Sequence, residues 1–402
     1  MFVDLIKISI CTYAMTVATE IALAVLQHLA QFRETTKEMK DFMSEDKIDK
    51  AASYAMAKSK FKIFECVYVF AKDAFVILNL GLIYSHLECL KGFRDVSFLM
   101  AIYLIDQVVR IPTHLFNDFV VEAKFGYNNK TFGTWVKDFF METIVSLILM
   151  FPLYLVILEL LNKFATFYIH ITIFVTLFRI FLYWIYPSVI APLFNKFEPF
   201  DTSKPLYKKI QDLAKNVKFE IDSMFVMDGS RRSGHSNAYF TGFGKKKRIV
   251  FYDTLLSQLK TDNQILGVLC HEFGHFKFYH IWTMLFFDTF TLFTGLFIFN
   301  RFYFLSPFPP AITVFLFMLI LSPAAYFVNI LKNYLSRRNE RQADKFAVDN
   351  GFGEDLKESL KILVEENSST LKNNYCYLLV NATHPTALER CETIKELLKK
   401  EE

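Results

Sequence analysis

Long blocks of apolar residues, separated by shorter polar segments, dominate the pattern along this chain. Each block is about 20 residues or more, the length that an α-helix needs to cross the hydrocarbon core of a bilayer. A single block would also suit a helix buried in a soluble core, but so many blocks in one chain favour membrane spans. The pattern predicts seven spanning helices, at about 5–31, 64–88, 96–116, 138–161, 165–190, 279–304 and 309–333.

A polar region separates the fifth predicted span from the sixth, and a polar tail follows the seventh. Within this region, residues 203–217 have the spacing of an amphipathic helix. Short strands are expected at 219–227, 238–240 and 248–252, around a turn rich in Gly and Ser. We therefore predict four parts, namely helices one to five in 1–190, a polar region in 191–278, helices six and seven in 279–333, and a tail in 334–402.

The composition supports a membrane protein. Hydrophobic residues make up 53% of the chain, 46 residues are Phe, and the mean hydropathy is +0.27. The net charge of +4 gives no reason to expect a nucleic-acid partner. The basic cluster 245–248 precedes an apolar strand-like segment, so it indicates a turn or a contact with anionic lipid headgroups. The bilayer is the predicted environment, and no oligomeric state is predicted.

Basic residues are unevenly distributed among the segments that connect the spans. Because cytosolic loops carry the excess of Lys and Arg, the first loop is predicted to be cytosolic and the N-terminus to lie on the other side. Counting spans from there places 191–278 and the tail after 333 in the cytosol. The first loop carries Arg33, Lys37, Lys40, Lys47, Lys50, Lys58, Lys60 and Lys62, against Lys91, Arg94 and Arg301 in the loops on the other side.

Ionisable residues occur inside the predicted spans at Glu20, Asp73, Asp106 and Arg110. Such residues rarely face lipid and usually line a cavity or pair with one another. Asp106 and Arg110 are four residues apart on one helix face and could simply neutralise each other. Together these residues predict a wet interior among the helices.

His271-Glu272-Phe273-Gly274-His275 forms an HExxH motif that follows an apolar stretch. Two histidines four apart on a helix lie about 40° apart around its axis, so both imidazoles can bind one metal ion. Glu272 then projects beside the metal, where it can act on a bound water. A solvated polar stripe is the alternative, which the apolar residues 265–270 oppose. The motif predicts one zinc ion per chain and the hydrolysis of a peptide bond.

A catalytic zinc ion needs a third protein ligand, with the fourth position left for water. Glu340 and Asp344 are candidates in the tail, Glu340 as that ligand and Asp344 as the partner of a ligating histidine. The alternative for Glu340 is an ordinary charged helix end. His280 is predicted not to complete the site, because on a continuous helix it lies about 180° from His271.

The six cysteines show no CxxC spacing, and in a protein whose polar parts face the cytosol they are expected to be reduced thiols. Cys270 adjoins His271 but points about 100° away from it on a helix. We therefore predict that Cys270 packs in the interior and does not bind the metal.

A strand beside an HExxH helix can serve the reaction. Its free edge can pair with the backbone of an extended peptide and hold the scissile bond over the metal. A plain structural hairpin is the alternative. We place this edge, and the substrate-binding residues, at His235, Ser236, Asn237, Ala238 and Tyr239.

Six stretches of the chain form longer motifs. They are FVVEAKFGYN at 119–128, YPSVIAPLFNKF at 186–197, HSNAYF at 235–240, HEFGH at 271–275, SRRNERQAD at 336–344, and His384-Pro385-Thr386 with Arg390. No general chemical requirement explains the run at 186–197, so it serves as a family marker. These motifs resemble those of the type I CAAX prenyl proteases, integral-membrane zinc proteases that process farnesylated proteins. The resemblance extends from near residue 112 to near residue 390 and is highly specific in its longer motifs.

The resemblance implies a mainly α, polytopic membrane protein. Seven transmembrane helices would surround a large water-filled chamber, capped on the cytosolic side by a small α+β zincin-type metalloprotease domain. Zinc ligands, catalytic base and substrate contacts are implied residue by residue. They are His271, His275 and Glu340 as ligands, Glu272 as the base, Asn237 and its neighbours lining the cleft, and His384 and Arg390 holding substrate or stabilising the transition state.

The substrate implied by the resemblance is a farnesylated CAAX peptide or protein, cleaved after the prenylated cysteine to release the terminal tripeptide. Some members make a second, upstream cut. The chain departs from the family in being shorter than typical members and in having Phe276 where Trp often follows the motif. Two other hypotheses stay open, a quality-control membrane protease that degrades misfolded or stalled proteins, and a non-catalytic scaffold or transporter with structural zinc.

The C-terminus, Lys399-Lys400-Glu401-Glu402, has the form of a dilysine retrieval signal of the endoplasmic reticulum, or is a solvated charged tail. The resemblance implies the same membrane, with the inner nuclear membrane as a second location. Acceptor sequences for N-glycosylation begin at Asn129, Asn367 and Asn381, and the predicted topology places all three in the cytosol.

Overall fold

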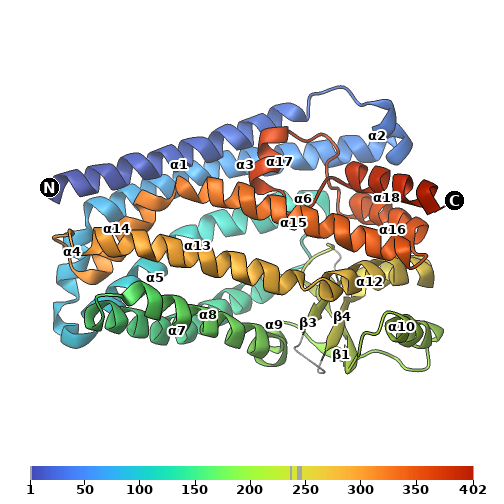
Figure 1. Ribbon diagram of the computed structural model, residues 1–402. Helices are drawn as coiled ribbons and strands as arrows, with labels where there is room; N and C mark the ends of the chain where they lie inside the picture. Colours follow the sequence, from blue (N-terminus) through green and yellow to red (C-terminus); the bar gives the residue numbers. More distant parts are fainter. Residues whose placement is uncertain (1, 236–237, 242–246, 402) are drawn as a thin grey trace.

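The computed structural model describes residues 2–235, 238–241 and 247–401. Long helices run along most of the molecule, and the two chain ends lie at its opposite extremes (Figure 1). A small sheet and a group of shorter helices gather at the end that holds the C-terminus. The predicted class, a mainly α membrane protein with a small α+β region, is confirmed.

Five helical segments of the described chain are long and apolar enough to span a membrane, or seven if each of two bent helix pairs is one span. The upper count equals the seven predicted spans. Three of the five are single helices, α1 (Phe2–Ala30), α7 (Phe132–Lys163) and α13 (His280–Tyr303). The fourth joins η1 (Glu88–Phe93), α5 (Arg94–Phe116), the π-helical η2 (Asn117–Glu122) and α6 (Ala123–Phe125). The fifth joins α8 (Phe167–Ile185), the π-helical η3 (Tyr186–Ile190) and α9 (Ala191–Phe194). The bent pairs are α3 (Glu45–Leu78) with α4 (Leu80–His86), at 65°, and α14 (Pro310–Leu321) with α15 (Ala324–Asp349), at 64°.

Helices α3 and α15 are both longer than a bilayer requires. With 34 residues in α3 and 26 in α15, these helices extend about 51 and 39 Å, whereas the hydrocarbon core is about 30 Å thick. Much of the predicted first loop is therefore the start of α3, preceded by α2 (Lys37–Phe42). The predicted boundary at 333 likewise lies inside α15. Hydropathy detects only the apolar part of such a helix, because the chain continues in helical form after its environment becomes polar.

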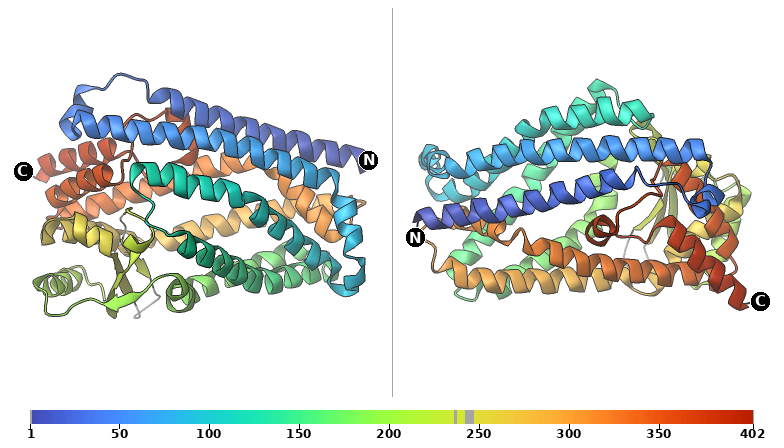
Figure 2. Two further views of the ribbon diagram at one scale, coloured as in Figure 1. Left: turned by 180° about the vertical axis from the view of Figure 1, so that it is seen from behind. Right: turned by 90° about the horizontal axis from the view of Figure 1, so that it is seen from above.

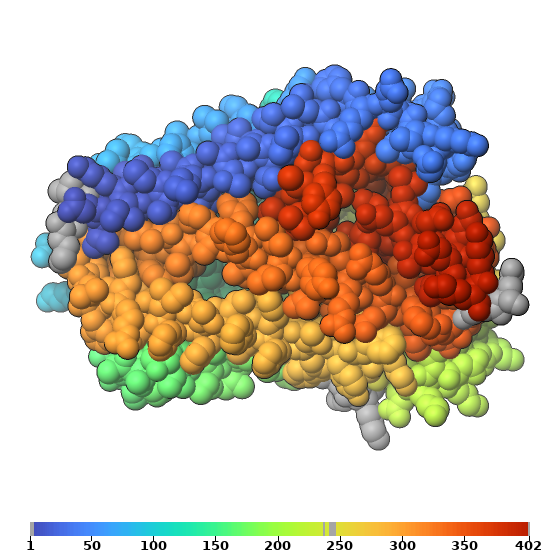
Figure 3. Space-filling model, turned by 45° about the horizontal axis from the view of Figure 1, so that its top comes forward, coloured from blue at the N-terminus to red at the C-terminus, as the bar shows by residue number. Residues whose placement is uncertain are grey.

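The spanning helices are little buried by one another. The buried share of the most apolar window is 28% in α1, 22% in the α5 segment and 0% in the α8 segment. Figure 3 shows a hollow in the surface between α13 and α15. Seen from behind and from above, the long helices run side by side along the molecule (Figure 2). These helices therefore leave most of their apolar surface uncovered by one another.

Charged side chains of α3 and α5 meet between these helices. The Arg110 guanidinium Nε donates to both carboxylate oxygens of Asp106 at 2.9 Å, as predicted for this pair. Lys72, which the prediction did not include, lies with its Nζ 2.5 Å from Asp106 and 2.5 Å from Asp73. Glu20 of α1 lies 3.5 Å from a lysine of α3. The ionisable residues therefore form a paired network, which lowers the free-energy cost of placing each charge within the membrane.

Four short strands form one sheet in the order β1-β2-β4-β3. The β2 and β4 strands are parallel, whereas β1 and β3 are antiparallel edge strands among the described residues. The predicted strands are confirmed to within a few residues, and β1 was missed because it is very short and ends in Pro199. The bounds are Phe197–Pro199 for β1, Ser223–Met227 for β2, Ala238–Thr241 for β3 and Arg248–Tyr252 for β4.

One face of the sheet packs against α12 (Asp262–Lys277), the helix that carries the HExxH motif. Ile249 and Phe251 of β4 are fully buried in one cluster with Leu269 and Phe273 of α12. This shared core fixes the motif helix beside the strands. The other elements at this end of the molecule are α10 (Pro205–Asn216), η4 (Gly229–Arg231), α11 (Asp253–Gln258), α16 (Gly353–Glu366), α17 (Tyr375–Asn381) and α18 (Ala387–Glu401).

Two glycines allow α12 to approach its neighbours closely. A Cβ at Gly274 would lie 2.9 Å from the Cα of Ala343 in α15, and one at Gly267 would lie 2.8 Å from the backbone nitrogen of Leu356 in α16. Such contacts are closer than van der Waals packing allows. The absence of a side chain at Gly274 therefore determines how near the HExxH motif lies to α15.

We predict that Gly274→Ala destabilises the protein, because the added methyl group overlaps the backbone of α15. Overpacking of this kind costs about 1–3 kcal/mol. Gly295→Ala in α13 is the matched control, since a Cβ there meets nothing within 4 Å and alanine favours a helix. Thermal unfolding in detergent should show a lower Tm for the first variant only, and equal Tm values would contradict this account of the packing.

Candidate active site

The motif helix has clear start and stop signals. At its N-terminus, the Thr261 hydroxyl accepts from the backbone N–H of Gln264, and the Gln264 side chain accepts from the Thr261 N–H, both at 3.2 Å. At the other end, Tyr279 has φ 58°, a left-handed conformation that ends one helix before α13 begins at His280. His271 and His275 therefore lie near the end of α12, next to the membrane helix that follows.

His271, His275 and Glu340 lie together as a candidate metal site. One ligand atom from each residue lies within 4.8 Å of the other two. The two Nε2 atoms are 3.1 Å apart, and the Nε2 atom of His275 is 3.2 Å from the Oε1 atom of Glu340. The site thus combines two residues of α12 with one of α15, as the sequence predicted.

Asp344 and Arg390 fix His271 from the Nδ1 side of its ring. An Asp344 carboxylate oxygen lies 2.8 Å from the Nδ1 atom of His271, which leaves Nε2 to face the ligand cluster. The Arg390 guanidinium donates to both oxygens of Asp344, at 2.6 and 2.9 Å. Burial alone would lower the pKa of Arg390, but the Asp344 carboxylate raises it above its ordinary value. Arg390 therefore remains charged and fixes the carboxylate that orients His271.

His280 and Gln342 support His275 in a similar way. The Nδ1 atoms of His275 and His280 are 2.9 Å apart, and the Nε2 atom of His280 lies 3.0 Å from the amide oxygen of Gln342. An amide oxygen only accepts, so His280 donates through Nε2 and can accept through Nδ1. His275 then donates through its own Nδ1 and presents an unprotonated Nε2 to the cluster. Helical spacing did not predict this role, because the left-handed conformation of Tyr279 breaks the helix between His275 and His280.

The donor set fits a catalytic zinc ion. Two imidazole nitrogens and one carboxylate are the ligands of such sites, with the fourth position open to water. The Oε2 atom of Glu340 is buried and accepts no hydrogen bond from any described residue, as expected of an atom that faces a cation. Glu272 lies outside the ligand cluster and lines the adjoining cavity. The arrangement can therefore hold zinc and place a carboxylate beside it.

The adjoining cavity joins the soluble elements to the membrane helices. It has a volume of about 430 Å³. Its walls come from α12 and β3 on one side and from α8, α13 and α15 on the other. Among the lining residues are Glu272, His275, Tyr239, Tyr183 and Met284.

His384 is the one predicted substrate or transition-state residue that has an exposed side chain near the ligands. Its side chain is 61% exposed, and its Nδ1 atom lies 2.8 Å from the Oε2 atom of Glu340, without the alignment of a hydrogen bond. Arg390 is instead buried behind Asp344. Cys270 packs in the core as predicted, and burial raises the pKa of its thiol to about 12.

The predicted substrate-binding segment is described only in part. Ser236 and Asn237 lie outside the described residues. Ala238 and Tyr239 begin β3, which pairs with β4 on one side and is an edge strand of the described sheet. This is the kind of strand that can pair with an extended peptide.

His235 is fixed by the FVVEAKFGYN motif. Its ring stacks on Tyr127 at a centroid distance of 4.2 Å, and its Nδ1 atom lies 3.1 Å from the Oδ1 atom of Asn367. Glu122, which lies 3.8 Å from the Nε2 atom of His235, accepts hydrogen bonds from Tyr54 and from a lysine of α3. The motif thus joins α3 and η2 to the segment that leads into β3.

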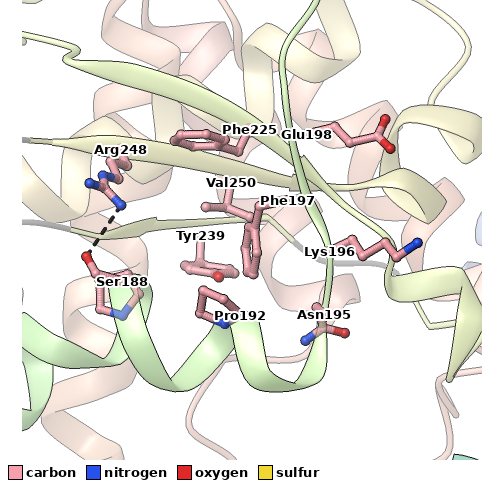
Figure 4. Close-up of a pocket in the computed structure, with 11 residues that line it drawn as sticks. Ser188, Pro192, Asn195, Lys196, Phe197, Glu198, Phe225, Tyr239, Arg248 and Val250 are labelled. Atoms are coloured by element: carbon pink, nitrogen blue, oxygen red, sulfur yellow. Dashed lines mark hydrogen bonds between the residues drawn. The ribbon is translucent and has the colours of Figure 1, made fainter.

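The YPSVIAPLFNKF run forms one wall of a second cavity, of about 660 Å³, shown in Figure 4. The opposite wall is the outer face of the sheet, where Phe225, Val250 and Tyr239 lie in register across β2, β4 and β3. Ser188 accepts a hydrogen bond from Arg248 at 3.4 Å across the opening. The ring of Tyr239 lines both cavities, so this marker sequence has a structural role beside β3.

Comparison with known proteins extends these observations over nearly the whole chain. Residues 25–196 match the family model of the CAAX prenyl protease N-terminal region with five membrane helices, and residues 202–398 match peptidase family M48. The chain is 33% identical to a CAAX prenyl protease 1 homolog of Arabidopsis thaliana, with 88% of each chain covered. It is 32% identical to CAAX prenyl protease 1 of Saccharomyces cerevisiae, with 88% of this chain and 86% of the relative covered.

The fold is also similar to a solved structure. The crystal structure of S. mikatae Ste24p superposes with a TM-score of 0.91 at 30% identity, covering 97% of this chain and 98% of that one. The two chains therefore share one fold over nearly their whole length. The chain belongs to the CAAX prenyl protease 1 family, in which the M48 peptidase region is joined to a membrane domain.

Proposed function

We propose that this protein is a zinc-dependent membrane endopeptidase that removes the C-terminal tripeptide of prenylated CAAX proteins. The observation that carries the proposal is the cavity where Glu272 and His275 face residues of α8 and α13. A peptide in this cavity contacts the hydrolytic residues while a lipid attached to it can remain among membrane helices. The relatives named CAAX prenyl proteases support the same substrate class.

His271, His275 and Glu340 would hold a zinc ion, which would lower the pKa of a bound water and act as a Lewis acid toward the scissile carbonyl. Glu272 accepts the proton of the attacking water and returns it to the leaving amine. His384 donates to the developing oxyanion from its exposed position beside Glu340. Asp344 and Arg390 hold the ligand set in place.

The edge of β3, where Ala238 and Tyr239 lie, aligns the peptide backbone. A second, upstream cut would use the same edge, because backbone pairing is independent of side-chain sequence. A quality-control protease would also use it. The lipid therefore distinguishes the two hypotheses, since only the prenyl protease gains affinity from it.

We predict that the purified protein cleaves a farnesylated CAAX peptide and that Glu272→Gln abolishes cleavage. Loss of the general base should reduce kcat by at least about a thousandfold, while zinc remains bound at one ion per chain because Glu272 lies outside the ligand cluster. Product release and metal content measure these two effects.

The unmodified peptide of the same sequence is the matched substrate, and a zinc chelator is the second control. Equal kcat/KM for both peptides would favour the quality-control hypothesis. Zinc without any cleavage by the unaltered protein would favour the non-catalytic hypothesis. Full activity of Glu272→Gln would refute the assigned base.

We further predict that His280→Ala weakens zinc binding by about 10- to 100-fold, because His275 loses the partner that fixes its tautomer. His280→Asn should restore part of the affinity, since its amide oxygen can accept from the Nδ1 atom of His275. Competition with a chromophoric chelator measures the affinity. His86→Ala, at the far end of the molecule, is the control, and unchanged affinity in His280→Ala would contradict this role.

We propose that the protein resides in the endoplasmic reticulum membrane with its active site in the cytosol, and that the inner nuclear membrane is a second location. The basic segment after α1 lies at the same end of the molecule as the sheet and the C-terminus, whereas the N-terminus lies at the other end (Figure 1). The positive-inside rule then supports a cytosolic metal site. The dilysine sequence at Lys399 and Lys400 would be accessible there.

This orientation predicts that Asn129, Asn367 and Asn381 carry no glycan in cells, because N-glycosylation occurs in the lumen. An acceptor sequence inserted in the loop between α13 and α14 should be modified instead. Mobility before and after glycosidase treatment measures both. A glycan on any of the three native sites would place the active site in the lumen.

A further inference from the structure

Arg179 is a basic residue inside the predicted span 165–190, carried by α8. Its Nη1 atom is buried and has no hydrogen-bond partner, and no described residue forms a hydrogen bond or ion pair with its side chain. This differs from the charges of α3 and α5, which are paired with one another. An unpaired guanidinium is costly in a membrane helix and marks a ligand site.

The position of Arg179 on its helix relates it to the active site. Residues four apart lie on one helix face, one turn apart along the axis. Tyr183, four residues after Arg179, lines the cavity that contains Glu272 and His275. Three residues before Arg179, Thr176 makes a hydrogen bond of 3.3 Å with Thr289 of α13. Arg179 therefore lies on the face of α8 that is shared with α13 and the active-site cavity, one turn deeper in the membrane domain than Tyr183.

The acidic residue nearest in sequence to Thr289 on α13 is already engaged. Asp288 accepts from the Nζ atom of Lys332 at 2.8 Å, which balances its charge. The positive charge of Arg179 thus remains uncompensated by the described chain, and its ligand must be an anion that arrives from outside.

We propose that Arg179 binds the free C-terminal carboxylate of the substrate, an inference that rests on the proposed function. In a CAAX substrate that carboxylate lies three residues beyond the scissile bond, a span of about 10 Å in extended form. One helical turn of about 5.4 Å separates Arg179 from Tyr183 at the cavity wall, and the long arginine side chain covers the remaining distance. A guanidinium is suited to this task because its two parallel N–H groups match a carboxylate.

Binding of the terminal carboxylate at Arg179 makes the site selective for the number of residues that follow the scissile bond. Backbone pairing along β3 accepts many sequences, whereas a cation at a fixed depth selects peptides that end three residues after the cut. The tripeptide acid should therefore bind, and its C-terminal amide should bind more weakly.

The test uses two farnesylated peptides of the same sequence, one ending in a free acid and the other in an amide. The unaltered protein should prefer the acid by roughly 10- to 100-fold in kcat/KM, the range expected for a charge-assisted hydrogen bond. Arg179→Met should lose this preference because its kcat/KM for the acid falls. Its kcat/KM for the amide should stay within about twofold of the value for the unaltered protein. Arg179→Lys should retain part of the preference, because it keeps the charge but not the planar fork.

Arg301→Met, at the far end of α13, is the matched control and should keep the full preference. Binding of the tripeptide acid and amide to the Glu272→Gln protein gives a second measure, independent of turnover. Equal cleavage of acid and amide by the unaltered protein, or an undiminished preference in Arg179→Met, would overturn the assignment of Arg179. Absence of cleavage of both peptides by the unaltered protein would instead count against the proposed function.

Discussion

The close approach of α12 to α15 is the contact on which the active site depends. Each helix alone carries an incomplete set of ligands, two histidines on one and a carboxylate on the other. Gly274 allows the backbones to come near enough for a 3.2 Å separation between His275 and Glu340. Since α15 is also a membrane helix, the same contact joins the metal site to the membrane domain.

Side chains next to the two histidines fix the orientation of their rings. Asp344 orients His271, and the pair of His280 and Gln342 orients His275. Each partner leaves the Nε2 atom of its histidine free to bind zinc. The left-handed conformation at Tyr279 makes the contact between His280 and His275 possible, because it ends α12 and places the His280 ring beside that of His275.

The membrane domain follows a different principle from the core around the sheet. In that core, Ile249, Phe251, Leu269 and Phe273 are fully buried and pack α12 against β4. The spanning helices instead bury few of their apolar residues against one another, and charged side chains of α1, α3 and α5 pair between them. The active-site cavity lies where these two architectures meet, and this position is suited to a substrate that is part peptide and part lipid.

The sequence alone predicted seven spans, the approximate strands, and the residues His271, His275 and Glu340 that the structure brings together, because hydrophobic periodicity and helical spacing are local properties of the chain. It could not reveal that α3 and α15 continue beyond the membrane, since a hydropathy profile detects only the apolar part of a helix. Nor could it find the roles of His280, Gln342 and Lys72, or the placement of Arg390 behind Asp344. Those contacts arise from a helix break and from side chains on separate helices, and only the tertiary structure decides which of them meet.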